Sequence, residues 1–264
     1  MITLYIKKDV LDIDKTFNSG QTVTWKKIKG YWVGFISNNP VAISQDEECI
    51  TVYGNVQEDD VRRFFDLDTD YDELIDTSNL NEYEIEAIKI GKGIRIMRQP
   101  LIEIMVTALM SPRNTLKATT NIIDNLRYNY GTKHNQFNID IYQFPKLDKM
   151  YNITEEECKD LKMGFRAKHF LSMMKRLEDD KELKFRIFMS NPVDAKNLLM
   201  SFYGVGDKVA DCVRLYALHH MNAFPVDTHI QQLQAMYGID ANRYSGYAGL
   251  MHQYLYYRKA ILNV

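Results

Sequence analysis

Residues 197–230 read NLLMSFYGVGDKVADCVRLYALHHMNAFPVDTHI, and this stretch decides the predicted fold. Apolar residues recur at helical spacing up to Phe202 and stop at Tyr203–Gly206, a turn whose two glycines permit unusual backbone conformations. A second helical pattern begins at Asp207, so the stretch predicts a helix-hairpin-helix. A glycine hairpin that opens into a helix N-terminus presents free backbone N–H groups and the positive end of the helix dipole, which suits a phosphate.

Lys208 and Asp227 are the candidate catalytic residues of this stretch. Lys208 lies in the first turn of the second helix, where the dipole opposes a cation, so the position suits an amine nucleophile better than a purely structural lysine. Asp227 precedes a third apolar pattern and is predicted to be the N-cap of a third helix. Each feature alone has a plain structural explanation, an ordinary helical hairpin or a simple N-cap. Their combination favours catalysis.

The segment from Leu199 to Ile230 resembles the signature of the helix-hairpin-helix DNA glycosylases, which ends in a Gly/Pro-rich loop and a catalytic aspartate. The resemblance implies that Lys208 attacks the sugar C1′ of a flipped nucleotide and expels the base, while Asp227 stabilises positive charge on the sugar. The resulting Schiff base then permits β-elimination of the 3′ phosphate. The residues expected to contact the DNA backbone are Gly204, Gly206 and His229. A helix-start histidine with no ligand is the alternative for the last of these.

Composition places the chain among soluble globular proteins. It has 264 residues, of which 45% are hydrophobic and 26% are charged, enough for one large domain or two small ones. The formal net charge is −2, so affinity for nucleic acid must come from a local basic face. No apolar run is long enough to span a bilayer and the N-terminus lacks the order of a signal peptide. We therefore expect an intracellular monomer, in the cytoplasm and nucleoid or in a nucleus, with no membrane partner.

No cofactor or metal is expected. The cysteines are odd in number and far apart, which disfavours a disulfide framework, a cysteine-rich metal site or an iron–sulfur cluster; they are Cys49, Cys158 and Cys212. The acidic stretch Asp66–Asp76 suggests a calcium loop, but Tyr71 replaces the required Gly and Thr77 the bidentate Glu. We expect these carboxylates to form a solvated helix start. The side chains expected to be buried around it are Phe64, Phe65, Leu67 and Leu74.

From about Thr22 to Tyr53 apolar residues alternate with a period of two between turn residues, which predicts a small antiparallel sheet. The segment that leads into it resembles the N-terminal part of the 8-oxoguanine DNA glycosylases. The matching residues are Phe17, Ser19-Gly20-Gln21, Trp25, Tyr31-Trp32-Val33-Gly34 and, further on, Gly93 to Glu103. The resemblance implies that the Gly20 carbonyl accepts the hydrogen that 8-oxoguanine carries on N7 and guanine lacks. A glycine in a turn before a strand is the alternative.

From Glu82 onward the apolar pattern is largely helical. The run from Leu101 to Met110 is continuously apolar, which predicts a central buried helix that stops at Ser111–Asn114. Further on, the segment from Glu155 to Leu177 is rich in cations and predicts a local basic face, although the net charge of the whole chain is negative. Its cations are Lys159, Lys162, Arg166, Lys168, Lys175 and Arg176.

Two segments are expected to meet the DNA beside the flipped nucleotide. In the family the break after the buried helix fills the gap in the duplex; here Arg113 is the preferred gap-filling residue, followed by Asn114. Lys117 stands where an arginine is expected and lacks the planar fork of a guanidinium. Phe165 is expected to wedge the duplex open while Arg166 hydrogen-bonds the partner cytosine. A buried Phe beside a surface Arg is the alternative.

The base pocket is predicted from the helix that carries Lys208 and from the last helix. Cys212 lies one turn after Lys208, and the resemblance places it against one face of the lesion and Tyr256 against the other. Taken alone, Cys212 could be a small buried hydrophobe. His252 falls where the family uses a glutamine to read the Watson–Crick edge, and Gln253 is adjacent. Either the register slips by one residue or His252 reads the base.

The sequence thus predicts an α+β fold, with an N-terminal antiparallel β domain at residues 1–80 packed on a helical helix-hairpin-helix region at residues 81–264. The predicted function is excision of 8-oxoguanine from double-stranded DNA, followed by nicking at the abasic site. Two alternatives stay open: a glycosylase of the same superfamily for another damaged base, and a non-catalytic helix-hairpin-helix DNA-binding protein. The joint presence of Lys208 and Asp227 weighs against the second.

Overall fold

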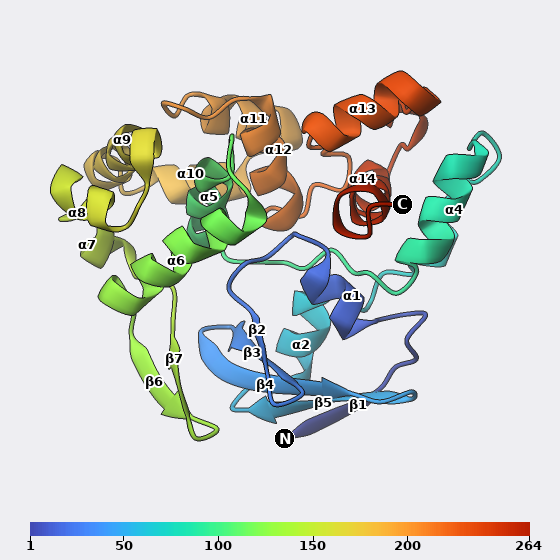
Figure 1. The fold of residues 1–264 in the computed structure, drawn as a ribbon, viewed down its shortest axis with the longest axis horizontal. Helices are drawn as coiled ribbons and strands as arrows, with labels where there is room; N and C mark the ends of the chain where they lie inside the picture. The colour runs from blue at the N-terminus through green and yellow to red at the C-terminus, as the bar shows by residue number, and fades with distance from the viewer.

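The predicted sheet lies at the N-terminal end of the computed structural model, which describes residues 1–264 (Figure 1). Its five strands are antiparallel in the order β1-β5-β4-β3-β2. They are β1 (Ile2–Tyr5), β2 (Lys26–Ile28), β3 (Tyr31–Ile36), β4 (Asn39–Gln45) and β5 (Cys49–Gly54). The prediction of a sheet within residues 22–53 is confirmed. The edge strand β1 was not predicted, because four residues give too short an alternation to recognise.

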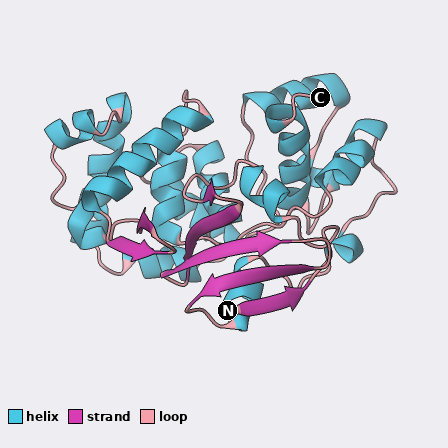
Figure 2. Ribbon diagram, turned by 60° about the horizontal axis from the view of Figure 1, so that its bottom comes forward, coloured by secondary structure: helices cyan, strands magenta, loops and turns pink.

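The rest of the chain is mostly helical, and Figure 2 shows most of the helices above the sheet. The helices are α1 (Ile13–Asn18), α2 (Glu58–Phe64), α3 (Tyr71–Leu74), α4 (Glu82–Gly91), α5 (Leu101–Met110), α6 (Leu116–Tyr130), α7 (Leu147–Met150), α8 (Glu155–Asp160), α9 (Ala167–Asp179), α10 (Leu183–Met189), α11 (Pro192–Met200), α12 (Asp207–Tyr216), α13 (Thr228–Tyr237) and α14 (Ala248–Tyr256). The unpredicted hairpin of β6 (Lys133–Gln136) and β7 (Ile139–Tyr142) places Ile141 against Val33 and Ala42 of the sheet. The α+β fold class is therefore confirmed.

An aromatic cluster joins the sheet to α1 and α2. The rings of Phe17 and Trp25 stack with their centroids 4.3 Å apart, and Phe64 and Trp32 pack on either side of them. A Cβ at position 34 would lie 2.4 Å from the Trp25 ring, so only glycine lets the indole lie flat on β3. This close approach gives a physical reason for the glycine in Tyr31-Trp32-Val33-Gly34.

Helix α5 is the centre of the helical body. Six of its ten residues are buried and the other four are half-buried, and it packs against α6, α9 and α12, as its continuous apolar sequence predicted. It ends at Ser111, and α6 begins after the turn Ser111–Asn114. The helix-hairpin-helix is also confirmed, because α11 ends at Met200 and α12 begins at Asp207 with Gly206 as its N-cap.

The chain between α4 and α5 is not helical, contrary to the expectation of helix from Glu82 onward. Its backbone instead bonds to separate parts of the protein: the Gly93 carbonyl accepts from Asp12, and the N–H of Gln99 donates to Tyr216 at the end of α12. Pairing with distant segments replaces the local bonds that a helix would need. The segment therefore ties the sheet region to the helical body. The division of the chain at residue 80 stays a prediction. Met97, which follows that boundary, packs in the smaller apolar core together with residues of the sheet.

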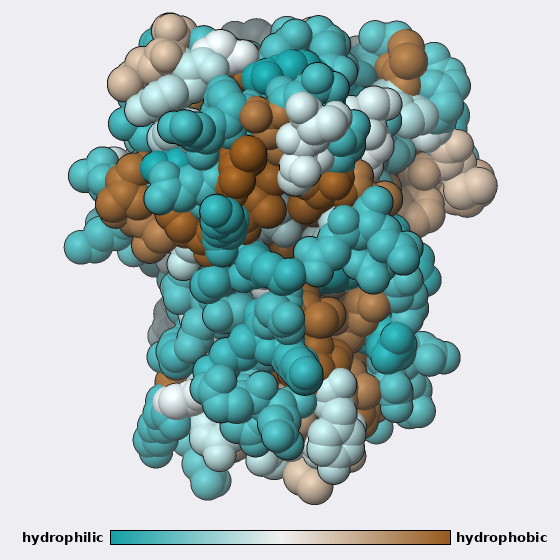
Figure 3. Space-filling model, turned by 90° about the vertical axis from the view of Figure 1, so that its right-hand side faces the viewer, coloured by the Kyte–Doolittle hydropathy of each residue, from teal (hydrophilic) through white to brown (hydrophobic).

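At the right-hand side of Figure 1, α4 contacts α13 and the C-terminal residues. Tyr83 stacks on Tyr237 with ring centroids 4.1 Å apart, and the Arg258 guanidinium lies 3.8 Å from the centroid of the Tyr83 ring. Figure 3 views the molecule from this side and shows apolar residues gathered across the upper half, whereas the lower half is mostly hydrophilic. No helix in the structure is both long enough and apolar enough to cross a membrane.

The acidic stretch after α2 departs from its prediction at one residue. Phe64 and Phe65 are buried and Leu67 and Leu74 are half-buried, but Asp66, expected in solvent, is also buried. Its side chain accepts hydrogen bonds from Arg98 at 2.9 Å and from Tyr71 at 3.0 Å, and it lies 3.0 Å from His219 Nε2. Arg98 and His219 lie outside this stretch, and Tyr71 folds back onto Asp66. No local sequence pattern therefore predicts that Asp66 is buried.

The pKa of Asp66 reflects this network. Burial alone would raise the pKa of the carboxyl group, but the hydrogen bond and charge of His219, followed by hydrogen bonds from Arg98 and Tyr71, hold it below its ordinary value. A carboxylate with a lowered pKa stabilises the fold above the pKa of an unfolded aspartate, about 4, and that stabilisation is lost as the pH falls toward the folded-state pKa.

We therefore expect Asp66→Asn to lower the free energy of unfolding by roughly 3 kcal/mol at pH 7, because it removes the buried carboxylate that Arg98 and His219 contact. Urea denaturation at pH 7 and near pH 3 would measure the change, which should shrink at the lower pH. Asp68→Asn is the matched control: its carboxylate is 71% exposed and paired with Arg62, so the loss should stay below about 1 kcal/mol. Equal effects of the two substitutions would contradict the assignment.

Candidate active site and DNA interface

Lys208 is the second residue of α12 and lies half-buried at the end of α5. Its Nζ donates a hydrogen bond to the Ser111 Oγ at 2.9 Å. The two residues are 97 positions apart, and no sequence spacing could have indicated the serine. The candidate nucleophile is therefore held by a neutral hydroxyl and not by a carboxylate.

Asp227 caps α13, as predicted, and its Oδ1 accepts from the N–H of Ile230 at 2.9 Å. Its charge and that of Lys208 act on the same two side chains, Cys212 and His252. Burial raises the pKa of the Cys212 thiol, while Lys208 lowers it and Asp227 raises it. The structure shows no ion pair between Lys208 and Asp227. Both charges thus lie near one set of side chains, the space around Cys212 and His252, and do not pair with each other.

His252 and Tyr256 lie on that space, one turn apart on α14. Their rings stack with centroids 5.9 Å apart and planes inclined by 21°, and Phe224 meets the imidazole edge-on at 5.5 Å. His252 Nδ1 has no hydrogen-bond partner. Burial lowers the pKa of His252 to about 4, so the imidazole is neutral near pH 7. Burial likewise raises the pKa of Tyr256 to about 12.

Gly20 faces Tyr256 from the other half of the chain. A Cβ at position 20 would lie 2.8 Å from Tyr256 Cε1, and the residue has a φ of +85°. Both the close approach and the left-handed backbone favour glycine. The structure thus brings Gly20, Cys212, His252 and Tyr256 together around the space that Lys208 and Asp227 face.

Gln253 points in a different direction from His252. Its side-chain oxygen accepts from the Tyr216 hydroxyl at 2.8 Å and its amide donates to the Ser19 carbonyl at 2.6 Å. The residue is fully buried. Because both ends of the carboxamide already have protein partners, the geometry favours His252 over Gln253 as the group that faces a base.

The turn Ser111–Asn114 meets the segment that carries Phe165 and Arg166. The Arg166 guanidinium donates from Nε, at 3.2 Å, and from Nη2 to the Pro112 carbonyl, and lies over the Phe165 ring at 4.4 Å. Arg166 is buried whereas Phe165 is 55% exposed, the reverse of a buried Phe beside a surface Arg. Burial lowers the pKa of Arg166.

The other candidate DNA contacts are distributed around this turn and the hairpin. Arg113 is exposed with a φ of +53°, and Lys117 is exposed in the first turn of α6. Asn114 is half-buried, and its side chain donates to the Met110 carbonyl at 3.2 Å. His229 lies at the start of α13, and its ring meets that of Tyr256 edge-on at 6.0 Å.

His169 connects the hairpin to the Phe165–Arg166 segment, a role that no sequence pattern indicated. Its ring packs edge-on against Tyr203 at 4.8 Å and Phe165 at 5.9 Å. A Cβ on Gly204 would lie 2.4 Å from this ring, whereas a Cβ on Gly206 would meet nothing. The first hairpin glycine is therefore required for packing, and the second keeps the N-terminus of α12 open.

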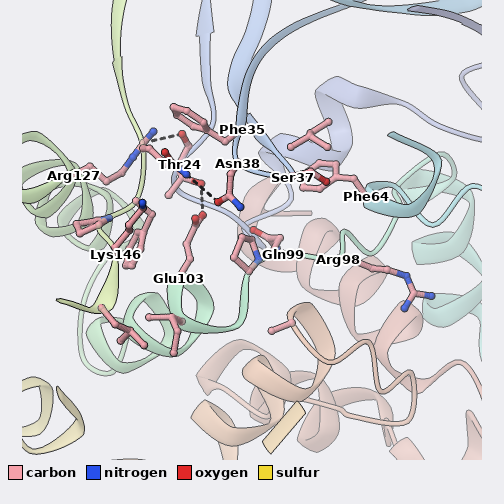
Figure 4. A pocket seen from close by; sticks show the side chains of 18 of the residues that line it. Thr24, Phe35, Ser37, Asn38, Phe64, Arg98, Gln99, Glu103, Arg127 and Lys146 are labelled. Carbon is pink, nitrogen blue, oxygen red and sulfur yellow. Dashed lines mark hydrogen bonds between the residues drawn. The ribbon is translucent and has the colours of Figure 1, made fainter. Parts of the chain in front are cut away.

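A cavity of about 900 Å³ lies elsewhere, between the sheet and the helical body. Figure 4 shows Glu103 there beside Thr24, whose hydroxyl donates to it at 2.7 Å. Burial raises the pKa of Glu103, and the Arg127 guanidinium donates to the Thr24 carbonyl nearby. None of the predicted site residues lines this cavity. It is therefore not the candidate active site.

Residues 3–105 match the 8-oxoguanine DNA glycosylase N-terminal domain, the region that contains Gly20 and its flanking motifs. The N-terminal part of the chain is therefore similar to the 8-oxoguanine DNA glycosylases. It is 27% identical over 270 residues to an N-glycosylase/DNA lyase of Saccharomyces cerevisiae, an alignment that covers 91% of this chain and 72% of the yeast protein. It is also 27% identical over 244 residues to the N-glycosylase/DNA lyase OGG1 of Arabidopsis thaliana, with 86% of this chain and 66% of that protein covered.

The fold agrees with a solved structure over its whole length. That structure is the Clostridium acetobutylicum 8-oxoguanine glycosylase/lyase in complex with double-stranded DNA that contains cytosine opposite 8-oxoguanine. The TM-score is 0.90 at 25% identity, and the match covers 100% of this chain and 99% of the other. The match therefore includes both the N-terminal part and the helical part of the candidate site.

The buried imidazole of His252 gives a direct test of the predicted pocket. We expect the His252 imidazole to titrate at about pH 4, well below an ordinary histidine, because burial disfavours its charged form. The unfolded chain then binds a proton at higher pH than the folded chain, so this group destabilises the fold as the pH falls from 6.5 toward 4. A histidine NMR titration, assigned by loss of the signal in His252→Gln, would measure the pKa. A midpoint near 6.5 would place the ring in solvent.

Proposed function

We propose that the protein excises 8-oxoguanine from double-stranded DNA and then nicks the abasic site. One observation carries this proposal: Lys208 and Asp227 do not pair with each other, and both lie close to Cys212 and His252, beside Tyr256 and Gly20. The two relatives are N-glycosylase/DNA lyases, and the solved protein of matching fold is an 8-oxoguanine glycosylase/lyase bound to DNA. These similarities support the same substrate and the same two activities.

Lys208 is the proposed nucleophile. The lone pair of its uncharged amine forms a bond from Nζ to C1′ as the C1′–N9 bond breaks, and the electron pair of that bond leaves with the base, which takes up a proton. The nitrogen loses a proton and the sugar ring opens with O4′ protonated, which leaves a Schiff base at C1′. Removal of a C2′ proton then expels the 3′ phosphate with the electrons of the C3′–O3′ bond. Asp227 stabilises the positive charge that builds on the sugar.

Recognition of the lesion rests on the Gly20 carbonyl. The carbonyls on either side of it are engaged: that of Ser19 accepts from Gln253 and that of Gln21 accepts from Gln99. The Gly20 carbonyl accepts no hydrogen bond within the protein. It is therefore free to accept the N7 hydrogen that distinguishes 8-oxoguanine from guanine. Cys212 and Tyr256 cover the two faces of the base, and His252 meets its Watson–Crick edge.

Contact with the opposite strand is assigned to the exposed groups around the turn Ser111–Asn114. Phe165 opens the duplex beside the flipped nucleotide and Arg113 enters the gap, while Arg166 reads the partner base. Arg166 must exchange its bonds to the Pro112 carbonyl for bonds to that base. The hairpin glycines and His229 hold the phosphates, with Lys117 and Asn114 nearby.

Borohydride reduction tests the nucleophile, because it traps a Schiff base as a covalent adduct. The native protein should form an adduct with a duplex that contains one 8-oxoguanine opposite cytosine, and Lys208→Gln should form none while still binding the damaged duplex. Lys196→Gln is the matched control. The Nζ of Lys196 lies 3.0 Å from Asp207 and 3.2 Å from Asp211, which raise its pKa more than burial lowers it, so it should not replace Lys208.

The outcomes separate the remaining possibilities. An adduct with abasic DNA but none with 8-oxoguanine would keep the mechanism and assign a different damaged base, to be found by excision assays across lesions. No adduct on either substrate would favour a non-catalytic DNA-binding protein. An adduct that persists in Lys208→Gln would show that another amine is the nucleophile.

His252 can be tested separately from the nucleophile. We expect His252→Ala to slow excision of 8-oxoguanine at least about 10-fold, because one discriminating contact to the base is lost, while nicking of preformed abasic DNA stays near the native rate. His252→Gln restores a side chain that can both donate and accept, so it should retain excision. Single-turnover rates on the two substrates would measure this. Equal slowing on both would show that His252 supports the fold and does not read the base.

A further inference from the structure

Ser111 is placed to control the direction of the Lys208 amine. The serine is the C-cap of α5, and its hydroxyl donates its one hydrogen to the Ala108 carbonyl at 2.8 Å. The Oγ can therefore only accept from Lys208, whose Nζ lies 2.9 Å away. An uncharged amine held through one of its own N–H bonds keeps its lone pair unengaged. The arrangement orients the nucleophile without blocking the electrons that attack.

A hydroxyl is also the right partner electrostatically. Lys196, on the neighbouring helix, lies within 3.2 Å of two carboxylates, Asp207 and Asp211, which favour its charged form. Ser111 carries no charge and so holds Lys208 in place without stabilising the ammonium in the same way. Lys196 on α11 and Lys208 on α12 thus differ in whether a carboxylate stabilises the charged amine.

The position of Ser111 is itself rigid. Helix α5 is buried among apolar side chains and packs directly on α12, which carries Lys208. The next residue, Pro112, has its carbonyl held by the guanidinium of Arg166, and the N–H of Asn114 donates to the Ser111 carbonyl at 3.1 Å. The hydroxyl is therefore anchored on both sides, which lets it fix an otherwise flexible lysine.

We propose that Ser111 is a positioning residue for the proposed glycosylase and lyase reaction: it aligns the Lys208 amine for attack at C1′ and joins the turn that faces the DNA to the nucleophile. This inference rests on the proposed function. Because the same amine acts on an intact lesion and on an abasic sugar, Ser111 should affect both substrates alike, in contrast to a residue that reads the base.

Single-turnover kinetics with Ser111→Ala tests the proposal. The rate constants for 8-oxoguanine excision and for borohydride trapping on abasic DNA should both fall about 10- to 100-fold, as expected when a nucleophile loses its alignment, while the dissociation constant for damaged DNA changes less than about twofold. Ser111→Thr keeps the hydroxyl and should stay within about threefold of the native rates. Ser190→Ala is the matched control, since Ser190 also caps a helix, its hydroxyl donates to the Arg186 carbonyl at 2.6 Å, and it does not touch the site.

Native rates for Ser111→Ala would overturn the inference, as would a Ser111→Thr variant as slow as Ser111→Ala, which would point to the shape of the turn and not to the hydroxyl. Either result leaves the proposed function standing when the native protein still forms its adduct on abasic DNA. Absence of that adduct in the native protein overturns the proposed function and this inference with it.

Discussion

The packing of α5 against α12 is the constraint on which the site depends. Helix α5 has most of its residues in the apolar core, and α12, which carries the proposed nucleophile, packs against it. The same contact fixes where the turn Ser111–Asn114 emerges, and with it the meeting of Ser111 and Lys208. A single apolar interface therefore sets the distance between the nucleophile and the surface that faces DNA.

The half of the site that is proposed to read the lesion is attached to this core by buried amide side chains. The Gln21 side chain accepts from the N–H of Met97 and donates to the Arg95 carbonyl, and Gln99 and Gln253 donate to the carbonyls that flank Gly20. Gln21 and Gln253 are hydrogen-bonded at both ends of their side-chain amides, whereas the Gln99 oxygen has no partner, so the first two do most to fix the chain around Gly20. The irregular segment between α4 and α5 is what makes this attachment possible, because its backbone is free to bond outside itself.

Charge has two separate uses in the molecule. Asp66 lies buried among Arg98, His219 and Tyr71, and its network joins the end of α2 to the chain that follows α12. Lys208 and Asp227 instead lack ionic partners and face a shared space. Paired buried charges act as structural connections, whereas unpaired charges directed at one space can act on a third group. With a net charge of −2 for the whole protein, binding to DNA depends on where the cations lie and not on their total.

The sequence by itself determined the elements with strong local signals. The alternation before Tyr53, the unbroken apolar run of α5, the glycine hairpin and the N-cap at Asp227 each obey a period or a capping rule that acts over a few residues. Only the tertiary structure decided the burial of Asp66, the non-helical segment before α5, the direction of Gln253 against His252, and the bond from Lys208 to Ser111. Each of these depends on a partner that is distant in the chain or on which way a side chain points, and a local pattern carries no information about either.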